Sequence, residues 1–338
     1  MTSPDPLRVA DLDESALLAR IFPLLPAGAA TLLGPGDDAA VVAAPDGRFV
    51  VSTDVLVEDR HFRRRWSTGY DVGARAAAQN LADVAAMGAR PTALVVSLAV
   101  PGDLAVAWVE GLARGLADAC APAGAAVVGG DLSGADAVVV AVTVHGDLGG
   151  RAPVRRSGAR PGDVVAHAGV RGFSAAGLAL LVAGVAAPAD GALGADGPLA
   201  PFVAGYLRPR PPLGSGPAAA DGGATAMLDV SDGLLRDAGR VAAASGVVVD
   251  LDGDLLAPDV AALAPAAAAL GADDGTALGW VLGGGEDHGL LATFPADAAL
   301  PAGFRAVGHV RAADGARPGV TLDGATPDVG PGWDHFGG

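Results

Sequence analysis

The chain contains no lysine, because all 22 of its basic residues are arginine. A Walker-A phosphate loop and a protein-kinase site each need a lysine that contacts phosphate. Schiff-base and pyridoxal chemistry need a lysine amine. If this protein transfers phosphoryl groups, it therefore does so with metal ions and arginine.

Cysteine and long apolar runs are also scarce. Cys120 is the single cysteine, so an intramolecular disulfide is excluded, and its place in a helical pattern predicts a buried, inert thiol. The apolar stretch at residues 175–189 contains glycine and proline and is shorter than the roughly 20 residues that span a membrane. The first residues lack a basic segment followed by an apolar core. We therefore expect no transmembrane helix, no signal peptide and a cytoplasmic location.

Positive charge is in short supply. The 22 arginines face 38 acidic residues, which gives a net charge of −16. Such a balance argues against nucleic-acid binding, where phosphate contacts supply most of the affinity. The one dense basic run, Arg63-Arg64-Arg65, is expected to be a solvated loop, with a phosphate-facing role as the alternative.

Aspartate recurs instead, at the ends of apolar runs or among small residues. Its motifs are Gly36-Asp37-Asp38, Ser52-Thr53-Asp54, Asn80-Leu81-Ala82-Asp83, Gly129-Gly130-Asp131 and Asp229-Val230-Ser231-Asp232-Gly233. Buried carboxylates are rare unless they are paired or bound to metal. Since few cations are present to pair with them, converging aspartates indicate a divalent ion, and hard oxygen ligands suit Mg²⁺ held together with substrate phosphates.

Hydrophobic periodicity predicts two consecutive α/β domains of the α+β type, 1–148 and 149–338, with mixed sheets and flanking helices. The boundary falls in the glycine-, arginine- and proline-rich stretch 146–162, and residues 188–222 are expected to be loop-rich. The predicted helices are 9–26, 70–87, 104–121, 174–185, 234–245 and 259–270. The predicted strands are 39–43, 48–53, 93–100, 125–128, 137–145, 164–168, 224–228, 247–251 and 289–294.

The motif Asp229–Gly233 joins an apolar strand to a helix, so free N–H groups and the positive helix end lie beside it. Simple N-capping would explain it equally well, but its repetition at Gly129–Asp131 favours a binding site. Gly283–Asp287 forms a third such turn. Six histidines without paired spacing argue against zinc.

Two other patterns fail as motifs. Gly34–Ala39 formally fits a dinucleotide fingerprint, but carboxylates stand where a pyrophosphate would approach and the next segment is a predicted strand. Asp250–Asp254 resembles the start of a calcium loop, but leucine and alanine occupy its required sixth and twelfth positions.

The ordered set of motifs resembles the thiamine-monophosphate kinases over nearly the whole chain. The aspartate motifs are joined by His61-Phe62, the segment Arg156–Asp163, Gly284-Gly285-Glu286-Asp287 and Gly332-Trp333-Asp334-His335-Phe336. The wider superfamily includes aminoimidazole ribonucleotide synthetase and selenophosphate synthetase. The resemblance implies that superfamily's two-domain fold, an acidic ATP–Mg²⁺ site and a homodimer that pairs through its N-terminal domains.

The resemblance also implies an activity: transfer of the ATP γ-phosphoryl group to thiamine monophosphate, giving thiamine diphosphate. No covalent or general-base residue is implied, since several Mg²⁺ ions and Arg156 would carry the transfer. The implied Mg²⁺ ligands are Asp38, Ser52, Thr53, Asp54, Asp83, Asp131, Asp229 and Asp232. The implied ATP contacts are Gly130, Asp131, Arg156 and Ser231. The implied thiamine-phosphate contacts are His61, Glu286 and Trp333.

Two features depart from the family pattern: the family often has tyrosine and glutamate where this chain has His288 and Gly289, and Trp333 replaces what is often another aromatic residue. Both lie on the substrate side. Two alternatives therefore stand beside the kinase: a sister ATP-dependent enzyme of the superfamily with another small substrate, and a metal- or nucleotide-binding protein without turnover.

Overall fold

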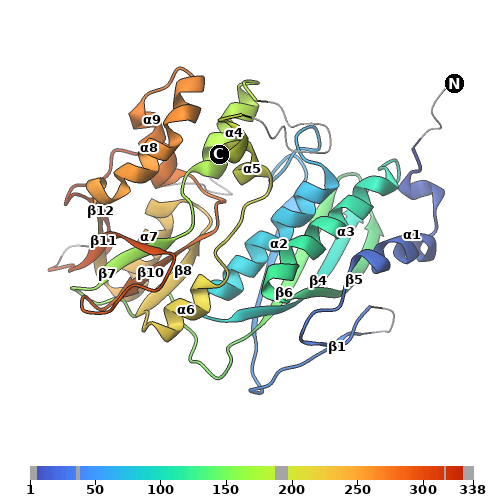
Figure 1. Cartoon of the computed structure of the whole chain (residues 1–338), viewed down its shortest axis with the longest axis horizontal. Coiled ribbons are helices and arrows are strands. Elements are labelled where there is room, and N and C mark those ends of the chain that lie inside the picture. The colour runs from blue at the N-terminus through green and yellow to red at the C-terminus, as the bar shows by residue number, and fades with distance from the viewer. Residues whose placement is uncertain (1–5, 36–38, 187–196, 316, 330–338) are drawn as a thin grey trace. The chain divides into compact units, whose positions relative to one another are not determined.

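The computed structural model describes residues 6–35, 39–186, 197–315 and 317–329. The chain divides into two compact units. Unit 1 comprises residues 1–84 and 91–149, and unit 2 comprises residues 85–90 and 150–338 (Figure 1). The short segment 85–90 belongs to unit 2 because Ala85 and Ala86 pack in its core and the Val154 amide donates to the Met87 carbonyl at 3.1 Å. No helix in the described ranges is long and apolar enough to span a bilayer.

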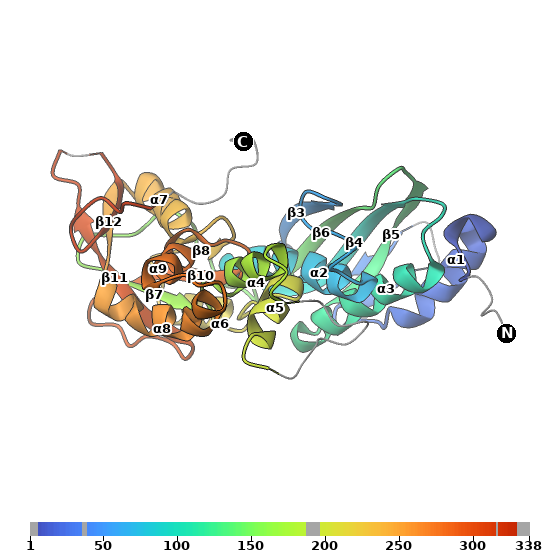
Figure 2. The same cartoon turned by 90° about the horizontal axis from the view of Figure 1, so that it is seen from above.

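Unit 1 is built on a four-stranded sheet with the order β3-β6-β4-β5. Its strands are β3 (Val50–Val57), β6 (Val139–Asp147), β4 (Arg90–Val100) and β5 (Ala126–Gly134). β3 and β6 run antiparallel, whereas β4 and β5 run parallel. Helices α2 (Gly69–Ala86) and α3 (Val106–Cys120) lie against one face of the sheet, as Figure 2 shows. Val140, Val142 and Val144 alternate along β6 and are fully buried.

Glycine lets α2 and α3 approach until their backbones touch. A Cβ added at Gly69 would lie 1.8 Å from the Trp108 carbonyl oxygen, and one at Gly115 would lie 2.1 Å from the Tyr70 carbonyl oxygen. Both contacts are with backbone, which cannot move aside as a flexible side chain can. This close pair holds α2 against the sheet and so fixes the position of Asp83, which it carries.

Unit 2 contains a six-stranded sheet with the order β12-β9-β11-β7-β10-β8. All neighbouring pairs are antiparallel except β12 with β9. Its strands are β7 (Val164–Ala168), β8 (Ala226–Val230), β9 (Val247–Leu251), β10 (Gly289–Phe294), β11 (Phe304–Ala312) and β12 (Gly319–Leu322). Its helices are α4 (Phe173–Val182), α5 (Ala200–Leu207), α6 (Ser215–Asp221), α7 (Leu234–Ser245), α8 (Gly253–Ala269) and α9 (Asp274–Gly283). The predicted fold class, mixed sheets with flanking helices, is confirmed.

Several element predictions were wrong. The single helix expected over 9–26 is the short α1 (Glu14–Ile21), flanked by 3-10 turns at Val9–Asp11 and Phe22–Leu24. Asp13 caps the start of α1 by accepting from the Ala16 amide at 2.7 Å, and Pro23 begins the second turn. A short hairpin of β1 (Thr31–Leu33) and β2 (Val41–Val42) follows, of which β1 was not predicted.

The expected loop 188–222 contains α5 and α6. Pro201 lies at the start of α5, where proline needs no N–H partner, so a proline-rich sequence is compatible with a helix here. The helix expected from residue 259 begins earlier, at Gly253, because Asp252 caps it. α9, β11 and β12 were missed altogether.

Candidate functional site

Two turns of unit 2 pack against each other through their backbones. The first, Asp229–Gly233, joins β8 to α7, and the second, Gly283–His288, leads into β10. The Glu286 amide donates to the Ser231 carbonyl at 2.8 Å. A Cβ at Gly285 would lie 2.3 Å from the Ser231 carbonyl oxygen, and one at Gly233, where φ is +113°, would lie 2.6 Å from the Gly283 carbonyl oxygen. The predicted ATP contact Ser231 and the predicted substrate contact Glu286 are therefore side by side.

Negative charge gathers at the first of these turns. The Asp237 carboxylate on α7 is buried and accepts from the Asp232 amide at 2.9 Å. Burial, with smaller contributions from the charges of Asp229 and Asp232, raises the pKa of Asp237 to about 6, although the hydrogen bond from the Asp232 amide and the charge of Arg240 oppose the shift. Arg240 contacts both Asp232 and Asp237. Arg236 also approaches Asp232, at 4.0 Å, so three carboxylates gather near two guanidinium groups.

Asp229 lies at the end of β8, with its Oδ2 3.4 Å from His288 Nδ1. His288 has a φ of +54°, a conformation uncommon for residues other than glycine. Asp229 and His288 are both buried, so the ring packs directly against the carboxylate. The tyrosine often found in the family at position 288 could not offer a ring nitrogen there.

In unit 1 the structure joins Ser52 on β3 to Asp83 on α2. The Ser52 hydroxyl donates to Asp83 Oδ2 at 2.6 Å. Asp54 shares the Ser52 side of β3, because alternate side chains of a strand point to the same face. Thr53 lies on the opposite side, where its hydroxyl donates to the Val142 carbonyl at 2.9 Å. A metal role for Thr53 stays a prediction.

Gly130 and Asp131 lie on the edge strand β5. A Cβ at Gly130 would be 2.0 Å from the Val96 carbonyl oxygen on β4, so only glycine fits. Both residues line a cavity of about 880 Å³ in unit 1 whose walls also include Thr92 and His145. Its other walls are mainly apolar side chains from α1, α3, the sheet and residues 39–49. The predicted ATP contacts of this unit thus border a space large enough for a small molecule.

His61 follows β3 in a loop. Its Nδ1 accepts from the Val57 amide at 3.0 Å, which places the proton of the neutral ring on Nε2. In the adjoining basic run, the guanidinium groups of Arg63 and Arg65 stack on the Trp66 ring at 4.8 and 4.6 Å. Arg64 bonds to Glu58 at 2.5 Å. The run lies in turns, with Arg64 and Arg65 exposed, as expected for a solvated loop, and its side chains contact Trp66 and Glu58.

The remaining predicted residues are less informative. Arg156 is exposed in unit 2, and its carbonyl accepts from Ser245 Oγ at 3.4 Å. Asp38 and Trp333 lie outside the described residues. Among the described residues, no group of three or more His, Cys, Asp or Glu side chains is arranged to hold a metal ion unaided. Mg²⁺ in phosphate-handling sites usually takes one or two carboxylates together with substrate phosphates and water, so the oxygen donors Asp229 with Asp232, and Ser52 with Asp83, fit that ion.

Sequence reasoning missed Asp287 as a structural residue. Its buried Oδ1 accepts from the Ser174 amide at 2.8 Å, at the start of α4. Burial raises its pKa to about 7, although bonds from the Ser174, Gly172 and Phe173 amides oppose the shift. Asp287 thereby ties the turn that carries Glu286 to α4. Sequence reasoning also missed the ion pair between Asp237 and Arg240. Their spacing of three residues on a predicted helix could have indicated it.

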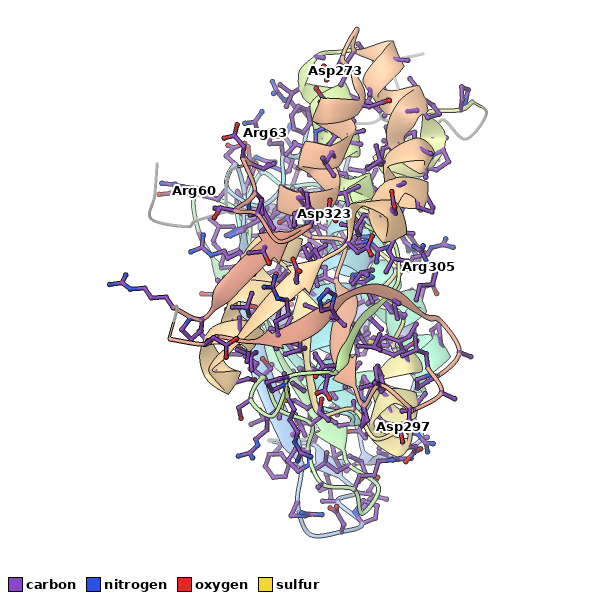
Figure 3. All side chains as sticks on the ribbon, turned by 90° about the vertical axis from the view of Figure 1, so that its left-hand side faces the viewer. Arg60, Arg63, Asp273, Asp297, Arg305 and Asp323 are labelled. Carbon is purple, nitrogen blue, oxygen red and sulfur yellow. The ribbon has the colours of Figure 1, made fainter. Side chains whose placement is uncertain are left out.

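A buried polar cluster lies beneath the same turn. His167 on β7 is fully enclosed, and burial, followed by the nearby charges of Arg171 and Arg305, lowers its pKa. Arg171 and Arg305, the latter labelled in Figure 3, both bind Asp259. A Cβ at Gly289 would lie 2.3 Å from the His167 ring. The glutamate often found in the family at position 289 therefore has no room while His167 keeps this position.

Cys120 is buried at the end of α3, as predicted. Burial raises the pKa of its thiol to about 12, so the thiolate required for nucleophilic or redox chemistry is scarce at neutral pH. The predicted burial of this thiol is confirmed.

The fold and the paired acidic turns define a class, the two-unit α/β proteins related to aminoimidazole ribonucleotide (AIR) synthetase. Residues 36–148 match the family model described as AIR synthase related protein, N-terminal domain. A structure of thiamine-monophosphate kinase from Stenotrophomonas maltophilia K279a is similar, with a TM-score of 0.76, 30% identity and coverage of 93% of this chain and 96% of that one. A structure of AaThiL complexed with AMPPCP and TMP gives a TM-score of 0.74 at 30% identity, covering 89% and 91%.

A relative of higher sequence identity than these two structures is also found. The thiamine-monophosphate kinase of Mycobacterium tuberculosis H37Rv is 48% identical over 326 residues, which cover 96% of this chain and 92% of that protein. The chain belongs to the thiamine-monophosphate kinase family. The resemblance drawn from the motifs is confirmed.

Proposed function

We propose that the chain transfers the γ-phosphoryl group of ATP to thiamine monophosphate, yielding thiamine diphosphate and ADP. The observation that carries this proposal is the 48% identity to a thiamine-monophosphate kinase across 96% of the chain. The two interlocked turns of unit 2, which bring Ser231, Asp232 and Glu286 together, support it. No observation favours a sister enzyme or a binding protein without turnover.

Mg²⁺ would be held by the acidic motifs of each unit: Asp38, Ser52, Thr53, Asp54, Asp83 and Asp131 in unit 1, and Asp229 and Asp232 in unit 2. When bound, Mg²⁺ neutralises the phosphate charges and aligns the in-line transfer. Gly130, Asp131, Arg156 and Ser231 would contact ATP. Gly130 suits this role because it lines the cavity of unit 1, and Arg156 suits it because its exposed guanidinium can bind phosphate.

The chain needs no general base. The acceptor is a phosphate monoester whose second pKa is about 6, so its attacking oxygen is already ionised at neutral pH. The main barrier is repulsion between two anionic phosphates. The protein's contribution is therefore to position the phosphates and to hold the Mg²⁺ that would counter their charge, a role that suits a chain rich in aspartate and without lysine.

His61, Glu286 and Trp333 would bind thiamine monophosphate. His61 presents a protonated Nε2, a hydrogen-bond donor, because its Nδ1 is occupied by Val57. Glu286 supplies negative charge for the cationic thiazolium ring. An aromatic ring such as that of Trp333 can stack on a flat cation, a contact that contributes about 0.5–2 kcal/mol.

A homodimer that pairs through unit 1 belongs to this proposal. β3 exposes Val51 and Val55, which are 54% and 46% accessible, on the sheet face opposite to the buried valines. Leu32 on β1 is 70% accessible. Exposed apolar side chains of this kind suit association with a second copy of the chain.

The decisive experiment measures ADP release with thiamine monophosphate, with thiamine and with no acceptor, at saturating ATP and Mg²⁺. The proposal expects ADP release that depends on thiamine monophosphate, with thiamine diphosphate formed in equal amount. Nucleotide binding without acceptor-dependent ADP release would instead favour a binding protein. Turnover in excess chelator would contradict the role of the divalent ion.

A further inference from the structure

Arg240 makes the densest set of ionic contacts at the acidic turn of unit 2. From α7 it contacts Asp232 Oδ2 at 2.5 Å and also binds Asp237 Oδ1. Asp237 has a fully buried carboxylate that accepts from the Asp232 amide. The guanidinium is thus held by the buried Asp237 carboxylate while it also bonds to an oxygen of Asp232.

The position of Arg240 bears on metal binding because Asp232 is one of the two proposed Mg²⁺ ligands in this unit. A carboxylate oxygen that accepts a short, charge-assisted bond from arginine carries less negative charge for another cation. The Asp232 side chain is only 15% accessible, so water screens the pair weakly. Guanidinium and a divalent ion are therefore competitors for the same oxygen.

We propose that Arg240 is a resident counter-cation that Mg²⁺ must displace from Asp232, so that Arg240 sets the Mg²⁺ concentration at which this turn is filled. This inference rests on the proposed metal role of Asp232. When only a fraction of molecules has the ligand available, the apparent dissociation constant rises by the inverse of that fraction. Removing the guanidinium should therefore tighten metal binding.

The chain provides a matched control on the same helix. Arg236 lies one turn before Arg240, and its Nε is 4.0 Å from the same Asp232 oxygen, beyond hydrogen-bond reach. Arg236→Gln and Arg240→Gln remove the same charge from nearby positions. Only Arg240→Gln removes the short bond, so the comparison separates direct competition from general electrostatic repulsion.

The experiment titrates Mg²⁺, without nucleotide, into the full chain and its variants, and follows binding by calorimetry and by the rise in melting temperature. We expect Arg240→Gln to bind Mg²⁺ about three- to tenfold more tightly than wild type, as befits a part-buried ion pair. Arg236→Gln should differ by about twofold or less, since the Arg236 Nε is 4.0 Å from the Asp232 oxygen and makes no short bond to it. Unchanged or weaker binding in Arg240→Gln, or equal tightening in both variants, would overturn the inference.

Two further variants keep the result interpretable. If Arg240→Gln does not fold, Arg240→Lys retains the charge but cannot contact both carboxylates with a fork of donors, and it should still tighten binding. If Arg240→Lys binds no more tightly than wild type, the inference fails. Asp232→Asn tests the assumption itself: wild-type Mg²⁺ binding in that variant would remove Asp232 from the proposed site. Weak binding in Asp232→Asn with no gain in Arg240→Gln would overturn only the role of Arg240.

Discussion

The contact between the two turns of unit 2 makes Gly285→Ala the sharpest test of the site. The added Cβ would lie 2.3 Å from the Ser231 carbonyl oxygen, whereas real Cβ contacts are essentially never shorter than 3.0 Å. Since both partners are backbone, one of the turns must move by at least about 0.7 Å to restore normal contact. The movement would separate Glu286 from Ser231 and Asp232.

The expected cost follows from that displacement. A misplacement of about 1 Å at a reacting centre can lower the rate about 100-fold, so kcat/KM for thiamine monophosphate should fall by about that factor. Overpacking typically costs about 1–3 kcal/mol of stability, which a chain with two substantial cores should tolerate. We expect an unchanged circular dichroism spectrum and a melting temperature that falls by only a few degrees.

Gly279→Ala serves as the control, because Gly279 lies in α9, shortly before this turn, and an added Cβ meets no atom within 4 Å. Alanine in place of glycine inside a helix stabilises it by about 1 kcal/mol. Its activity should match wild type and its melting temperature should not fall. If Gly285→Ala also retained wild-type kcat/KM and stability, the close packing of the two turns would be refuted as a requirement of the site.

Three other predictions concern the metal ligands, a buried carboxyl group and the dimer. Asp54→Asn and Asp131→Asn should each lower Mg²⁺-dependent ADP release by orders of magnitude without changing the melting temperature, and wild-type rates would remove those residues from the site. Burial raises the pKa of Asp287 from its ordinary 3.8 to about 7 in the folded chain. Between these pH values the folded state keeps a proton on Asp287 that the unfolded state has lost, so the free energy of unfolding falls as pH rises from about 4 to about 7. Asp287→Asn should reduce this loss, by at most about 4 kcal/mol, in denaturant titrations at pH 4 and pH 8; an equal pH dependence in both proteins would contradict the assignment. Val55→Glu, on the exposed face of β3, should shift the mass measured by light scattering at micromolar concentration from dimer towards monomer, and a monomeric wild type would contradict the proposed dimer.

The sequence predicted several elements to the residue because local signals agreed there. β7, β9 and β10 are short apolar runs bounded by turn residues, and α7 begins after Gly233 and ends before Gly246, which adopts the left-handed conformation expected at a helix end. In the 188–222 stretch the loop prediction rested on Pro209, Pro211 and Pro212, which lie between α5 and α6 and so did not exclude a helix on either side. Local sequence patterns therefore predict the bounds of a helix or strand correctly where the turn residues and the apolar residues indicate the same element.

The order and spacing of the acidic motifs were sufficient, by themselves, to determine the family. Contacts between residues distant in the chain were decided only by the tertiary structure: Ser231 against Gly285, His167 against Gly289, and Ser52 bonded to Asp83. None of these pairs leaves a periodic signal, because each depends on where two separate elements pack. The sequence therefore indicated the family and its chemistry, and the packing within each unit decided which of these residues lie in contact.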